Sequence, residues 1–235
     1  MKWRWLIAVL GLFAGGILVQ GPALADTLTI SPAADAYVSA NLATTNYGAS
    51  PVMNVGLSGG VYKRIADLKF DLSALSGINT ADLLSATLYL NLYYRNPASY
   101  LQPAITVSHV DNDAWTEMGV TMSTQPTIGS AIAIRASNPP LGWIAFDLLS
   151  LSNAWVAGDL TDGKLSVALS VSSSTGTYSN PSNTDYKFYS RDYATEALRP
   201  YLTVVYNPVP VPPTVLLVGS GLLGLVGMAW RRKHD

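Results

Sequence analysis

Strict alternation of apolar and polar side chains over residues 84–95 constrains the fold more than any other feature of this sequence. Successive side chains of a β-strand point to opposite faces of a sheet, so the run predicts a long strand with one buried face. Residues 66–71 and 164–171 repeat the pattern, and shorter runs lie at 37–39, 53–56, 105–110, 143–146, 186–190 and 202–206. In the longest run, the face expected to be buried carries Leu84, Ala86, Leu88, Leu90, Leu92 and Tyr94.

Clusters of Gly, Asn, Pro and Ser separate these runs, as turns between strands require. We therefore predict an all-β domain over residues 26–206, folded as a jelly-roll-like antiparallel β-sandwich. One short helix is expected where Leu148, Leu151 and Trp155 follow helical spacing, because Asp147 in front of them is a good N-cap residue.

The first 25 residues have the pattern of a secretory signal peptide. Lys2 and Arg4 precede an apolar run, and Ala23 and Ala25 supply the small residues that a signal peptidase reads, so cleavage is expected before Asp26. An uncleaved N-terminal membrane anchor is the alternative.

The C-terminal end combines a proline-rich linker, residues 207–213, with an apolar tail, residues 214–235. A helix over the uncharged residues 214–230 is about 25 Å long, close to the hydrocarbon thickness of a bilayer, and the basic residues after it mark the cytoplasmic side. The tail resembles the PEP-CTERM sorting signal, which implies processing by an exosortase, through Pro210, Pro212, Pro213, the glycine-rich apolar stretch, Arg231 and Arg232. Val211 stands where that signal has glutamate, and a plain membrane anchor is the alternative.

Composition excludes several classes of function. Nine of the 14 Lys and Arg residues but fourteen of the 15 acids lie in residues 26–206, a formal charge near −5 that disfavours nucleic-acid binding. The chain has no cysteine, so disulfides and thiolate chemistry are excluded. His109 is the one histidine of this region, and its alternation with Ile105 and Val107 predicts a hydrogen-bonded, partly buried side chain.

Exposed aromatic rings are the candidate ligand-binding groups. Tyr89 and Tyr93 fall on the polar face of the longest run, Tyr100 follows it, and Trp115 lies in a polar loop. Planar rings stack on the apolar faces of sugars, but they also pack beneath loops or against a second sheet, and both readings stay open. Trp143 and Trp155 lie among apolar residues at packing spacing and are expected in the core.

Two sets of charged residues have candidate structural roles. Asp111, Asp113 and Glu117 form an oxygen-rich stretch with the donors that calcium prefers, although a solvated turn has the same composition. Arg64 shares its phase with Leu68 and needs a carboxylate partner, for which Asp192 and Glu117 are candidates. Arg191 and Arg199 are expected in similar ion pairs.

The middle region is similar to the DNRLRE domain, which is also described as a carbohydrate-binding module family. The likeness is carried by stretches that include Asp35-Ala36-Tyr37-Val38, Trp115-Thr116-Glu117, Phe188-Tyr189-Ser190-Arg191-Asp192 and Leu198-Arg199-Pro200-Tyr201-Leu202. Met122 and Asp192 depart from the tryptophan and glutamate of the family pattern. The resemblance implies a jelly-roll sandwich that occurs on secreted and surface proteins and is linked to polysaccharide binding.

These features predict a non-catalytic protein, exported, held at the inner membrane before processing, and then located at the cell surface or outside the cell. It is expected to bind or organise extracellular polysaccharide, with structural calcium as its candidate ion. A structural or protein-binding module is the first alternative. A polysaccharide-degrading enzyme is the second, although no catalytic motif supports it.

Overall fold

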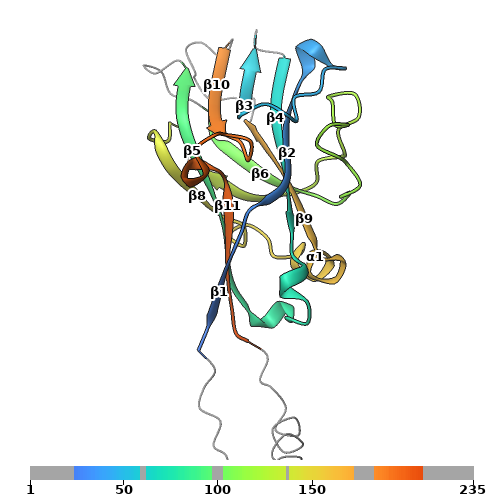
Figure 1. Ribbon diagram of the computed structural model, residues 1–235, viewed down its shortest axis with the longest axis vertical. Helices are drawn as coiled ribbons and strands as arrows, with labels where there is room; N and C mark the ends of the chain where they lie inside the picture. Colours follow the sequence, from blue (N-terminus) through green and yellow to red (C-terminus); the bar gives the residue numbers. More distant parts are fainter. Residues whose placement is uncertain (1–23, 59–61, 97–102, 136–137, 172–182, 209–235) are drawn as a thin grey trace, which may run out of the picture.

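The computed structural model describes residues 24–58, 62–96, 103–135, 138–171 and 183–208 (Figure 1). The strands of this part are β1 (Asp26–Ile30), β2 (Pro32–Ser39), β3 (Val52–Ser58), β4 (Tyr62–Asp71), β5 (Leu83–Asn96), β6 (Ile105–Val110), β7 (Ala131–Arg135), β8 (Gly142–Asp147), β9 (Lys164–Val171), β10 (Asn183–Tyr189) and β11 (Tyr201–Tyr206). One α-helix, α1 (Val156–Asp162), and short 3₁₀ turns at Ala40–Leu42, Ser73–Leu75, Thr80–Asp82 and Glu196–Leu198 complete it.

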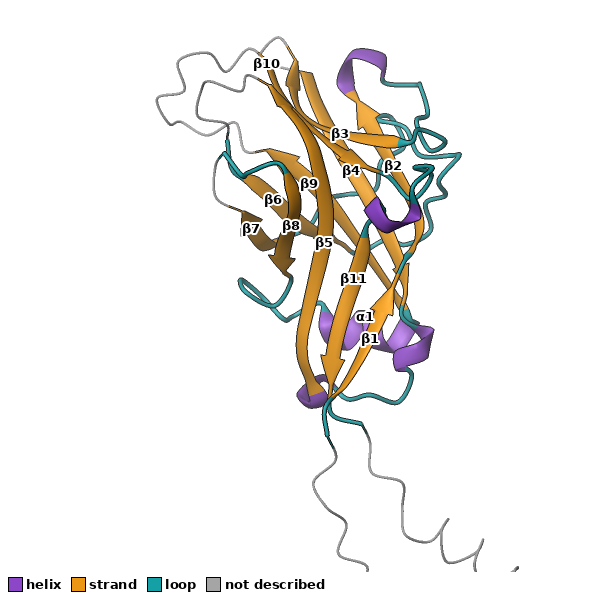
Figure 2. Ribbon diagram, turned by 60° about the vertical axis from the view of Figure 1, so that its left-hand side comes forward, coloured by secondary structure: helices purple, strands orange, loops and turns teal. Residues whose placement is uncertain are grey.

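The strands form one antiparallel sheet that curls back on itself into two facing layers. Its hydrogen-bonded order is β1-β11-β5-β10-β3-β4-β9-β6-β7, with β2 on β4 and β8 on β5. One layer contains β8, β5, β11 and β1, the other contains β2, β4, β9, β6 and β7, and β10 and β3 connect them (Figure 2). The predicted jelly-roll-like fold class is confirmed.

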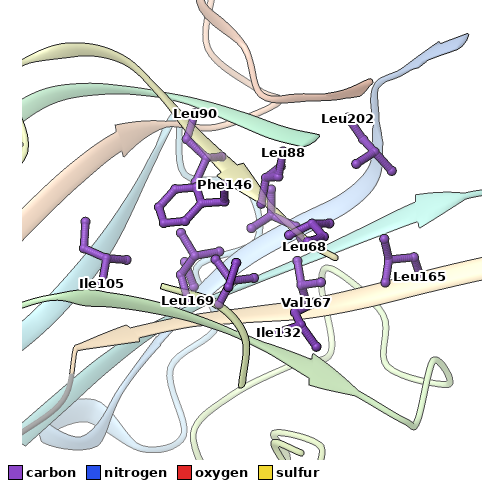
Figure 3. Close-up of a cluster of buried hydrophobic side chains, with 14 of the residues drawn as sticks. Leu68, Leu88, Leu90, Ile105, Ile132, Phe146, Leu165, Val167, Leu169 and Leu202 are labelled. Carbon is purple, nitrogen blue, oxygen red and sulfur yellow. The ribbon is translucent and has the colours of Figure 1, made fainter. Parts of the chain in front are cut away.

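Leucine and valine side chains from both layers fill the space between them. Leu88, Leu90 and Phe146 of one layer face Leu68, Val167 and Leu169 of the other (Figure 3), and all six are 2% exposed or less. The predicted inward face of β5 is therefore correct over residues 86–92. Leu84 and Tyr94 were expected on the same buried face, but they are 50% and 40% exposed. The reason is that the pairing register of β5 shifts beside each of them, between Leu83 and Ser85 opposite β11 and between Leu92 and Tyr94 opposite β10, which interrupts the alternation.

A second, smaller hydrophobic cluster lies on the outer face of the layer that contains β4 and β9. The connection between β6 and β7, residues 111–130 and here called the cover loop, places Trp115 and Val120 on that face. The buried members of the cluster are Ala34, Ala36, Val38, Ile65, Val110, Trp115, Val120 and Ala168. Because the cover loop excludes water here, Asp67 and Ser166, which alternate outward, are also buried.

The helix begins later than the sequence predicts. Residues 148–155 form turns, and the Asp147 carboxylate accepts a hydrogen bond from the Leu149 N–H at 3.0 Å instead of capping a helix. Helix α1 ends at Gly163, whose φ of 74° is the left-handed conformation that favours glycine. The expectation of one short helix holds, but its predicted position was wrong.

Strand β1 pairs with β11, so the first and last strands are neighbours and the chain enters and leaves at one pole of the sandwich (Figure 1). No helix within the described residues is long and apolar enough to cross a bilayer. The predicted signal peptide up to residue 23, and the sorting tail with Pro210, Pro212, Pro213, Arg231 and Arg232, lie outside the described residues.

Candidate functional site

Aromatic side chains gather on the outer face of the layer formed by β8, β5 and β11. Tyr89 and Tyr201 are directly opposite in the β5–β11 ladder, and their rings stack with centroids 4.8 Å apart. Trp143 of β8 meets Tyr201 edge to face at 5.2 Å. Trp143 is 41% exposed and Tyr89 and Tyr201 are half-buried, so this trio, here called the Trp143 cluster, presents ring surface to solvent.

A second aromatic stack lies further along β5. Tyr189 stands between Tyr93, at 4.6 Å, and Tyr193, at 3.8 Å. Both faces of the Tyr189 ring are therefore covered by other rings. Tyr89 and Tyr93 are on the predicted face, but they belong to two separate stacks, and the buried Asn91 lies between them along β5. Tyr100 lies outside the described residues.

A polar pocket of about 480 Å³ adjoins Tyr201. Glu196 and Arg199 line it from the turn before β11, and Thr29 and Ser31 line it from the other side. The Arg199 guanidinium is held by the Tyr193 carbonyl, to which Nε donates at 2.7 Å, and by Glu196 Oε1 at 3.5 Å. Rings next to fixed charged and hydroxyl groups can stack on the apolar face of a sugar while its hydroxyls are hydrogen-bonded.

The tryptophans are arranged differently from the sequence interpretation. Trp155 is buried as expected, whereas Trp143 was expected in the core and is exposed, because it alternates with the buried Ile144 and therefore points outward from β8. Trp115, a candidate ligand-binding residue, is only 8% exposed. Its Nε1 donates to Ser166 Oγ at 3.1 Å, and Lys69 Nζ lies 4.6 Å from its ring centroid.

Three carboxylates from distant parts of the chain meet between β2, the cover loop and the segment after β10. Asp35, Glu117 and Asp192, here called the acidic group, each place an oxygen within 4.8 Å of the others. Asp35 is fully buried, and burial raises the pKa of its carboxyl to about 7. Among the described residues this is the one such group of three or more potential metal ligands.

The predicted calcium ligands are divided between different surroundings. Glu117 belongs to the acidic group, but Asp111 and Asp113 do not. Asp111 is 84% exposed and bonds His109, and the carbonyl of Asp113 accepts a hydrogen bond from Lys69 Nζ at 3.0 Å. Asp35 and Asp192 were not recognised as metal ligands, although both stand in stretches that carry the family resemblance.

The arginines form ion pairs, with one partner other than expected. Arg191 lies 3.4 Å from Glu117. Arg64 pairs at 3.2 Å with Asp185, and not with Asp192 or Glu117. The physical reason is strand register: Gly56 of β3 is opposite Arg64 on one side and Asp185 on the other, and its missing side chain lets the two charges meet.

His109 lines a pocket of about 470 Å³ near helix α1. Its Nδ1 lies 2.8 Å from Asp111 Oδ1 and its Nε2 lies 3.0 Å from Asp159 Oδ2, which confirms a hydrogen-bonded, mostly buried histidine. The hydrogen bond to Asp159 is the main cause of the raised pKa of His109. Because both ring nitrogens contact carboxylates, neither is free to activate a serine hydroxyl.

An antiparallel sandwich with exposed rings beside a polar pocket defines a class of ligand-binding module. The sequence profile of carbohydrate-binding module family 96 matches residues 26–206, and the chain belongs to that family. The expected resemblance to a carbohydrate-binding module is thereby confirmed. A comparison with curated proteins finds no match.

Proposed function

We propose that this protein is a non-catalytic surface or matrix protein that binds or organises extracellular polysaccharide through the Trp143 cluster and the adjoining pocket. The observation that carries this proposal is Trp143 itself, a large aromatic side chain left 41% exposed in a sandwich of this family. Tyr201 belongs both to the cluster and to the pocket, so a sugar stacked on the rings lies within reach of Arg199 and Glu196.

Binding is tested by affinity electrophoresis of the full chain in gels that contain neutral or acidic polysaccharides. Because the full chain includes the apolar residues 214–230, the gels contain a detergent, and this detergent should have no sugar headgroup that could compete for the aromatic rings. We expect at least one polysaccharide to retard the protein, and Trp143→Ala and Tyr201→Ala to weaken binding by about tenfold each, because a ring stack contributes about 0.5–1.5 kcal/mol beyond the area it buries.

Tyr94→Ala is the matched control. Tyr94 is an exposed aromatic residue of the same strand, but its ring lies beside Lys187, whose Nζ is 4.9 Å from the ring centroid, and it belongs to neither aromatic stack. Its replacement should leave retardation unchanged. Absence of retardation by every polysaccharide, or equal losses in Tyr94→Ala and Trp143→Ala, would contradict the proposed site.

Export and sorting complete the proposed function. The signal-peptide pattern supports cleavage before Asp26, and the PEP-CTERM-like tail supports tethering at the inner membrane followed by exosortase processing and release to the surface. N-terminal sequencing of the mature protein should begin at Asp26. Intact-mass measurement of the released form should show loss of the tail, and a mature protein that keeps residues 214–235 would favour the plain anchor.

A further inference from the structure

The acidic group is built by contacts that hold its members in place from several sides. The Asp35 N–H donates to Glu117 Oε1 at 3.0 Å. Asn46 Nδ2 donates to the carbonyls of Glu117 and Val120, both at 2.7 Å. Gly48 packs so closely on this turn that a Cβ there would lie 2.2 Å from the Glu117 carbonyl oxygen. The position of Glu117 is therefore determined by main-chain contacts.

The third member is held in a similar way. Ser190, which is fully buried, donates its hydroxyl to the Ser50 carbonyl at 2.7 Å and accepts the Asp192 N–H at 3.1 Å. Asp192 is itself exposed, so solvent reaches the group from this side. The three carboxylates thus lie at the boundary between the sandwich and water.

Hydrogen bonds leave one oxygen of this group without a partner. Asp35 Oδ2 accepts the main-chain N–H of Arg191 at 2.7 Å, but no donor in the described part of the chain reaches Asp35 Oδ1. Asp35 is 0% exposed. A buried carboxylate oxygen without a donor costs a large share of its hydration free energy, so such an atom needs a compensating partner.

Arg191 does not supply that partner. Its Nη1 contacts the Ala33 carbonyl and lies 3.4 Å from Glu117 Oε2, and neither contact involves the Asp35 side chain. One guanidinium also leaves three carboxylates with a formal surplus of negative charge. A cation would offset this negative charge, and the side-chain atoms of the acidic group that could coordinate it are all carboxylate oxygens.

We propose that the acidic group binds one divalent cation, calcium, between Asp35, Glu117 and Asp192. Ligand sets made only of oxygen select hard cations, and calcium accepts irregular coordination that solvent completes, as the exposed Asp192 permits. The ion joins β2, the cover loop and the segment after β10. In a chain without cysteine it performs the cross-linking that disulfides supply in other exported domains.

The test is the thermal stability of the full chain, treated with EDTA, desalted and titrated with calcium chloride, with isothermal titration calorimetry as the direct measurement of binding. Extracellular calcium modules have dissociation constants of about 10⁻⁴–10⁻³ M, so 5 mM calcium should raise the melting temperature by about 5 °C. Glu117→Gln and Asp192→Asn should abolish the shift. Asp192 is exposed, so Asp192→Asn removes one ligand of the proposed site without altering the buried Asp35.

Asp111→Asn is the matched control, because Asp111 belongs to the cover loop but not to the acidic group, and it should keep the full calcium response. The proposal is overturned if the wild-type chain binds no calcium, or if Asp192→Asn retains the shift while Asp111→Asn loses it. Polysaccharide retardation measured on the same samples reports separately on the Trp143 cluster.

Discussion

Asp67 shows how a covered outer face changes the chemistry of a single residue. It points outward from β4, where an exposed carboxylate would be ordinary, but the cover loop buries it and Gln125 donates to both of its oxygens, at 3.0 and 3.1 Å. Burial outweighs these hydrogen bonds and raises the pKa of Asp67 to about 7. The folded protein therefore keeps a proton that the unfolded chain releases near pH 4.

From this we predict that the free energy of unfolding falls as pH rises from about 4 to 7. In this window the folded state binds more protons than the unfolded state, so one such group contributes a loss of about 1 kcal/mol per pH unit. Asp67→Asn, which carries no charge at any pH, should reduce this slope and be more stable than the wild type above pH 7. Urea unfolding at several pH values measures the effect.

Asp71→Asn is the control for this experiment. Asp71 lies on the same strand, but the Ser73 N–H bonds its carboxylate and lowers its pKa, so it titrates below the window. Its variant should keep the wild-type slope between pH 4 and 7. An unchanged slope in Asp67→Asn would show that Asp67 is ionised in the folded protein throughout the window.

Among the elements, the cover loop acts as a third layer on the sandwich although it contains no strand. Trp115 anchors it, and we predict that Trp115→Ala costs about 3–5 kcal/mol of unfolding free energy through the cavity it leaves. Trp115→Phe keeps a ring and loses the hydrogen bond to Ser166, a cost of about 1–2 kcal/mol.

Replacement of the exposed Trp143 by alanine should have the opposite pattern, with little effect on the free energy of unfolding and a large effect on sugar binding. Equal destabilisation by Trp115→Ala and Trp143→Ala in urea would refute this division.

The sequence predicted the elements best where one physical signal acts alone. The period-two leucines of β5 and the valines of β9 indicate a buried face without further information. Alternation cannot distinguish a face open to water from one under a loop, which is why Trp143 was wrongly expected in the core and why the sequence left Trp115 open between a binding and a packing role. The acidic group depends on tertiary contacts that bring β2, the cover loop and the segment after β10 together, and local sequence spacing contains no record of those contacts.

At the scale of the whole molecule, the pairing of β1 with β11 places the first and last strands together at one pole of the sandwich. If the proposed anchor over residues 214–235 holds, we expect the β1 and β11 pole to lie nearer the membrane than the β3 and β10 end (Figure 1). The Trp143 cluster lies on the side of the sandwich, on strands β5, β8 and β11, and not at the pole where the described chain begins and ends.

Because the chain has no cysteine, an introduced cysteine pair can test both the pairing of β1 with β11 and the export of the protein. Thr29 of β1 is opposite Thr203 of β11, and Thr203 is opposite Thr87 of β5. We expect Thr29→Cys with Thr203→Cys to form a disulfide when the chain keeps residues 1–25, because exported proteins meet an oxidising compartment, and to stabilise the fold by up to about 4 kcal/mol. Non-reducing electrophoresis after thiol alkylation detects the cross-link.

Thr29→Cys with Thr87→Cys is the control. These two positions are separated by two strand spacings, about 10 Å, which is too far for a disulfide. The same cysteine pair should stay reduced in the cytoplasm when residues 1–25 are deleted, and its oxidation there would contradict export as the origin of the cross-link.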